Sequence, residues 1–89
     1  MMYMFYTTGG VWELSWEKLH RKAYKTVEEA TEELKKHMVE KGCKLKNLQV
    51  WHGANPSKKS ILEVRNRHKA DENSFDDIPM TGYIIEIEV

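Results

Sequence analysis

The chain has little of what marks disulfide-stabilised, metal-binding or membrane-spanning proteins. Cys43 is its one cysteine, so no internal disulfide can form and a reducing compartment is expected. The four histidines are never spaced from one another or from Cys43 as metal ligands are. The apolar run at residues 1–6 lacks a basic start and is too short for a signal sequence or a membrane span. We therefore expect a cytoplasmic protein with no metal and no cofactor.

Net charge is also missing. The 14 Lys and Arg residues balance the 14 Asp and Glu residues, so no overall field draws the protein to nucleic acid or to an anionic membrane. Hydrophobic residues make up 40% of the 89 positions, which is enough for a folded core. The length predicts a single domain over residues 1–89.

The clearest local signal is a helix between Thr26 and Gly42. Thr26 precedes Glu29 by three positions, the spacing of a capping box, and Gly42 suits the left-handed residue that ends a helix. Between them the apolar positions form one stripe, which predicts an amphipathic helix from Val27 to Lys41. The stripe consists of Val27, Ala30, Leu34, Met38 and the stem of Lys41.

Residues 2–17 are predicted to form a β-hairpin with Gly9 and Gly10 as its two-residue turn. That turn would pair Thr7 with Trp12, Phe5 with Leu14 and Tyr3 with Trp16. Residues 18–25 fit both a helical and an extended pattern. We favour a strand that continues irregularly to Tyr24, with a bulge near Leu19.

Three further strands are expected, at residues 45–52, 60–67 and 82–89. Their inward positions include Leu48, Val50, Leu62 and Val64. A turn-rich segment at 53–59 and a long mobile loop at 66–79 separate them. The order β-β-α-β-β-β predicts an α+β fold with one helix packed on one face of a mostly antiparallel sheet. A right-handed crossover would make the second and third strands parallel.

A single helix can cover only one face of such a sheet. The uncovered face would carry apolar side chains in numbers that usually mark an interface, either with a second copy or with a host protein. These residues are Met2, Met4, Tyr6, Val11, Trp51, Ile61 and Ile84. If the strand register is off by one position, some of them belong to the core instead.

Basic residues gather in the segment from 58 to 69, and two interpretations of them are open. The first is an anion site for a nucleotide or another phosphate ligand, without a strong nucleic-acid signal. The candidate residues are Ser57, Lys58, Lys59, Arg65, Arg67 and His68. We favour the second interpretation, a charged strand in which Arg65 and Arg67 pair with Glu63, Glu86 and Glu88.

No catalytic residues are predicted. The strand carboxylates alternate as outward charges, and none forms an isolated pair in an apolar context. Cys43 follows the end of the predicted helix, where the negative end of the dipole disfavours a thiolate. We expect a protein that is not an enzyme.

Residues 20–52 combine the helix entry Tyr-Lys-Thr-Val-Glu-Glu-Ala with the strand Leu-x-Asn-Leu-Gln-Val, after a short aromatic hairpin. This arrangement resembles the small orphan proteins of bacteriophages and mobile elements. The resemblance implies an accessory role without catalysis, either inhibition of a host defence protein or sequestration of its nucleotide signal. A small nucleotide or nucleic-acid binder that uses residues 58–69 is the alternative function.

Overall fold

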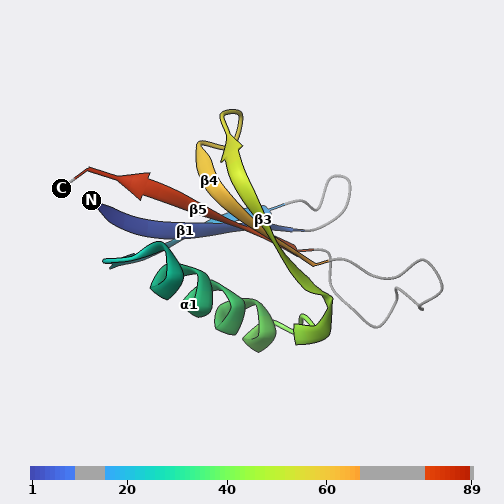
Figure 1. The fold of residues 1–89 in the computed structure, drawn as a ribbon. Coiled ribbons are helices and arrows are strands. Elements are labelled where there is room, and N and C mark those ends of the chain that lie inside the picture. The colour runs from blue at the N-terminus through green and yellow to red at the C-terminus, as the bar shows by residue number, and fades with distance from the viewer. Residues whose placement is uncertain (10–15, 67–79, 89) are drawn as a thin grey trace.

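A computed structural model describes residues 1–9, 16–66 and 80–88. In this part of the chain one α-helix packs against a five-stranded antiparallel sheet, which confirms the predicted α+β fold and its β-β-α-β-β-β order (Figure 1). The strands lie in the spatial order β2-β1-β5-β4-β3. The elements are β1 (Met2–Gly9), β2 (Trp16–Tyr24), α1 (Val27–Glu40), the short 3-10 helix η2 (Leu45–Asn47), β3 (Leu48–Asn55), β4 (Ser60–Asn66) and β5 (Met80–Ile87).

The predicted helix start and stop are confirmed. The Thr26 hydroxyl accepts a hydrogen bond from the Glu29 backbone N–H at 3.1 Å, as a capping residue does. At the other end Gly42 has a φ of 114°, and the Cys43 N–H donates to the Met38 carbonyl at 3.0 Å. This geometry ends the helix because it satisfies a carbonyl that the last turn would otherwise leave free.

The core lies between α1 and the sheet. Ala30, Leu34 and Met38 from the predicted helix stripe are fully buried there. Strand residues complete the cluster; among them are Phe5, Leu62, Val64, Met80 and Ile84. Leu34 approaches β5 so closely that a Cβ at Gly82 would lie 2.5 Å from its Cδ1 atom. Position 82 therefore needs glycine for the helix to reach the sheet.

The predicted register of the first hairpin is wrong. Gly9 pairs with Trp16 and Phe5 pairs with His20, whereas the predicted turn would pair Phe5 with Leu14. Residues 10–15, which include Trp12 and Leu14, lie outside the described residues. The expected strand to Tyr24 is present. Its pairing with β1 shifts between His20, which lies opposite Phe5, and Tyr24, which lies opposite Tyr3.

The predicted parallel direction of the second and third strands is confirmed, but the two strands are not neighbours. β2 and β3 run in the same direction but lie at opposite edges of the sheet, because β5 takes the centre between β1 and β4. β3 also continues past residue 52 to Asn55. β4 ends at Asn66, and residues 67–79 of the predicted loop lie outside the described residues.

Candidate functional site

The sheet face opposite α1, which we call the open face, carries a row of side chains that crosses all five strands of the described sheet. Register pairs place side chains on the same side of a sheet, so the pairing of each strand with the next defines the row. Its members are Leu19, Tyr6, Tyr83, Glu63 and Trp51. No helix in the described residues covers this side, and the hairpin end of β3 and β4 rises from the sheet away from α1 (Figure 1).

The connection between β3 and β4, residues 56–59, folds over the open face. The Tyr6 hydroxyl donates a hydrogen bond of 2.6 Å to the Lys58 carbonyl, and the Lys58 Nζ lies 5.8 Å from the centroid of the Tyr83 ring. The rings of Tyr6 and Tyr83 stack at 4.9 Å. Each of these tyrosines is only 8% exposed, although it lies on the side of the sheet without a helix. The 56–59 turn is thus fixed to the centre of the sheet.

The Tyr6 hydroxyl stays a donor over the physiological pH range. Burial of the phenol, together with the smaller effects of the negative charges of Glu17 and Glu63, raises the pKa of Tyr6 to about 12. The bond to the Lys58 carbonyl therefore does not depend on pH near neutrality.

A pocket of about 400 Å³ opens between the turn and the sheet. The strands contribute both apolar side chains and a carboxylate to its lining, and the turn contributes two lysines and a serine. The lining residues are Tyr6, Glu17, Leu19, Ser57, Lys58, Lys59 and Ile85. The fold thus brings part of the predicted anion site and part of the predicted apolar face into one concave site. Such a combination suits a ligand with both a flat apolar part and a negative charge.

A buried carboxylate holds the base of the turn. Glu63 is 6% exposed and accepts hydrogen bonds from Asn55 Nδ2 at 2.7 Å and from Arg65 Nε at 2.9 Å. Asn55 also accepts a bond from the Ser57 hydroxyl at 2.7 Å. The Asn55 hydrogen bond is the main reason that the pKa of Glu63 is lowered, with Arg65 adding to it and burial opposing it.

Arg65 is used inside this network. Besides its ion pair with Glu63, its guanidinium lies 4.2 Å from the centroid of the Trp51 ring. Of the two predicted roles for Arg65, the structure shows the ion pair, and the partner is Glu63. Glu86 instead lies opposite Tyr3 on β1.

The residues predicted for the uncovered face are only partly brought together. Met2 and Met4 are half-buried on β1, and Trp51 remains 41% exposed on the open face. Ile61 is half-buried and packs against the core cluster. Ile84 was placed on the wrong face: it is fully buried under α1, because its register partners are Phe5 and Leu62 of the helix side.

Val11, Arg67 and His68 lie outside the described residues. The sequence reasoning did not select Glu17, Leu19, Tyr83 or Ile85 for the site. Tyr83 and Ile85 alternate along the last strand, a signal that could have placed them on the open face. Nothing in the sequence indicates that the 56–59 turn folds back over it.

A second group of side chains lies on the helix side at the β2 edge. His20 stacks on Phe5 with ring centroids 4.4 Å apart, and His37 of α1 lies 5.5 Å from His20. Burial lowers the pKa of His37, and the nearby His20 and Lys41 lower it further. In the part of the chain that the structure describes, no three His, Cys, Asp or Glu side chains gather as metal ligands would.

We expect this group to make the fold less stable in mild acid. A histidine whose pKa is lowered on folding binds a proton more readily in the unfolded chain, so stability is lost as the pH falls below the ordinary value of 6.5. Urea unfolding measured at neutral and mildly acidic pH should show this loss, and His37→Gln should reduce it. The matched control is His52→Gln on the exposed edge strand β3. This variant should lose as much unfolding free energy between neutral and mildly acidic pH as the wild type does. If His37→Gln loses as much stability in mild acid as the wild type does, His37 is not the source of the pH dependence.

Comparison of the chain with models of protein families, with curated proteins and with solved structures finds no match. Neither α1 nor any other helix in the described residues has the length and apolar character of a membrane-spanning segment. Any functional conclusion therefore depends on the geometry of the open face.

Proposed function

We propose that the protein is a non-enzymatic binding protein whose open-face pocket takes a nucleotide. The observation that carries the proposal is the contact between the Tyr6 hydroxyl and the Lys58 carbonyl. It holds a lysine-bearing turn against the sheet, so one pocket offers both positive charge and apolar side chains.

The parts of a nucleotide match the parts of this pocket. The exposed ammonium groups of Lys58 and Lys59, with the Ser57 hydroxyl, can bind phosphate oxygens. Leu19 and Ile85 offer apolar surface to the base. The Glu17 carboxylate can accept hydrogen bonds from sugar hydroxyls or from an exocyclic amino group. The pocket volume of about 400 Å³ falls in the range of small-molecule sites.

The proposal includes no chemical step. Binding alone lowers the free concentration of a nucleotide, and sequestration of a host's nucleotide signal is one of the two roles that the resemblance to phage and mobile-element proteins implies. Such a signal would be met in the cytoplasm, where the single buried cysteine Cys43 would remain a thiol.

A host protein is the second candidate ligand, and Trp51 supports it. Trp51 is 41% exposed, and its ring lies beneath the Arg65 guanidinium. Tryptophan and arginine dominate the binding energy of many protein interfaces. A protein partner would cover this part of the open face, near β3, rather than the pocket near β1 and β2.

Calorimetric titration with purine and pyrimidine nucleotides, at low and at moderate salt, tests the proposal. We expect binding that weakens with salt, because phosphate contacts to exposed lysines are screened. The double variant Lys58→Glu, Lys59→Glu should bind at least about tenfold more weakly, a change of about 1.4 kcal/mol. The matched control Lys25→Glu, Lys44→Glu makes the same change of charge at exposed positions outside the pocket and should bind as wild type does.

Tyr6→Phe tests whether the position of the 56–59 turn matters for binding when the charge of the pocket is unchanged. It removes the hydroxyl that holds Lys58 but leaves the ring and both lysines, so affinity should fall because the turn is no longer held in place. Absence of nucleotide binding by the wild-type protein would overturn the proposal. If the Lys58→Glu, Lys59→Glu variant and the Lys25→Glu, Lys44→Glu control lose the same affinity, the effect is one of overall charge. That result would also contradict the proposal.

A further inference from the structure

The two edges of the described sheet differ in charge. β2, at one edge, carries Glu17, Lys18, Arg21 and Lys22. β3, at the other edge, has no charged residue from Leu48 to Asn55. Natural sheets use charged side chains on edge strands to prevent pairing with another chain. β3 lacks this protection, and no other strand among those that the structure describes pairs with its outer side, so this edge can take a further strand.

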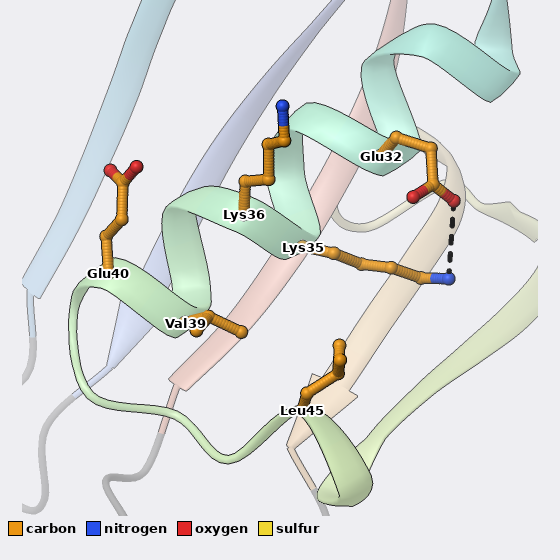
Figure 2. Close-up of a pocket in the computed structure, with 6 residues that line it drawn as sticks. All are labelled: Glu32, Lys35, Lys36, Val39, Glu40 and Leu45. Atoms are coloured by element: carbon orange, nitrogen blue, oxygen red, sulfur yellow. Dashed lines mark ion pairs between the residues drawn. The ribbon is translucent and has the colours of Figure 1, made fainter.

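The sheet beside β3 is also left partly uncovered by α1. A groove of about 260 Å³ lies between the helix and this edge. Its lining residues are Val27, Glu28, Thr31, Glu32, Lys35, Val50, His52 and Leu62. A second groove of about 660 Å³ continues along the helix and shares Glu32 and Lys35 with the first. Figure 2 shows Val39 and Leu45 on its walls, with the Lys35 side chain extended beside them.

We infer that β3 pairs antiparallel with β3 of a second copy of this chain, about a two-fold axis at Val50. The regular part of the strand is 48–52, because the register with β4 shifts between His52 and Asn55 and Gly53 has a φ of 132°. Val50 is the centre of that part. The pairing places Val50 opposite its counterpart and Gln49 opposite Trp51 of the second copy.

A second copy fits this edge better than a charged foreign segment does. β3 has no charged side chain of its own and the chain has a net charge of zero, so no overall charge opposes the approach of two copies. The symmetry also brings η2 of one copy towards the later half of the other copy's β3. Leu45, 65% exposed in η2, then gains apolar contacts beside the groove. The open-face pocket remains free, since β1, β2, β5 and the 56–59 turn line it.

Analytical ultracentrifugation of charge variants tests this pairing. The wild-type protein should be a dimer at high micromolar concentration. In the double variant Gln49→Lys, Trp51→Lys, each lysine lies opposite a lysine of the second copy. In the double variant Gln49→Glu, Trp51→Glu, each glutamate likewise lies opposite a glutamate. Either variant by itself should therefore be a monomer. Mixed together, the two variants should form a heterodimer. The control Trp16→Lys, Ala23→Lys adds the same charge to the β2 edge and should remain a dimer.

A cysteine variant gives a second readout if the charge variants fail to fold. Val50→Cys places two thiols at the axis, so mild oxidation should link the copies, whereas Ala54→Cys should not form the link. A monomeric wild-type protein would overturn the inference. The inference would also be overturned if the charge variants fold and stay dimeric. It would be overturned as well if the two variants are monomers but do not associate when mixed. None of these results depends on nucleotide binding.

Discussion

Replacement of Leu34 by alanine is expected to lower the free energy of unfolding by about 2–5 kcal/mol. Leu34 is fully buried at the centre of α1 and contacts β5 at Gly82, so the substitution leaves a cavity in the main contact between helix and sheet. Thermal or urea unfolding measures the loss. A stability equal to that of wild type would show that α1 does not pack on the sheet through this face.

Gly82→Ala provides the partner variant for a double-mutant cycle. Alone, the added methyl group would lie within 3 Å of three side-chain atoms of Leu34, and overpacking of this kind costs about 1–3 kcal/mol. In the Leu34→Ala background those atoms are absent and the methyl group enters the space they leave. The double variant should therefore be more stable than the sum of the two single losses predicts. Simple additivity would contradict the close approach.

Asn55→Asp should cause the second large effect, a loss of about 1–3 kcal/mol at neutral pH. It replaces the donor 2.7 Å from Glu63 Oε1 by a second carboxylate, so two negative charges meet at a site where Glu63 is buried. The loss should shrink as the pH falls towards the acidic range, because one proton can then be shared between the two carboxyl groups.

Unfolding measured over a series of pH values checks this expectation. Ser57→Ala is the matched control, since it removes an exposed hydrogen bond to Asn55 and leaves the Glu63 contact in place. Its effect should be small and independent of pH. A pH-independent loss in Asn55→Asp would mean that Glu63 does not contribute as a buried carboxylate.

The sequence was sufficient for the elements whose signals are local. The Thr26 cap, the Gly42 stop and the apolar stripe of α1 each depend on residues within a few positions, and all three are present in the structure. The inward positions Leu62 and Val64 were also predicted from alternation alone. Local chemistry and tertiary packing agree at these positions.

Features that depend on distant contacts could not be predicted in this way. The insertion of β5 between β1 and β4 places Ile84 opposite Phe5, and no local pattern distinguishes that face from the other. The site has the same origin, because Tyr6 and Lys58 are separated by 52 positions and meet only when the 56–59 turn folds over the sheet. The lysines and the apolar face were each identified, but as alternatives rather than as one pocket.

An NMR titration of the uniformly ¹⁵N-labelled protein with a nucleotide is the most direct test of the central claim that the open-face pocket binds such a ligand. Amide signals of Tyr6, Leu19, Lys58, Lys59 and Ile85 should shift in a saturable manner. Signals of Lys36 and Val39 on the outer side of α1 should stay in place, since they lie on the other side of the sheet. Saturable shifts confined to α1 or to β3, or no shifts at all, would contradict the account.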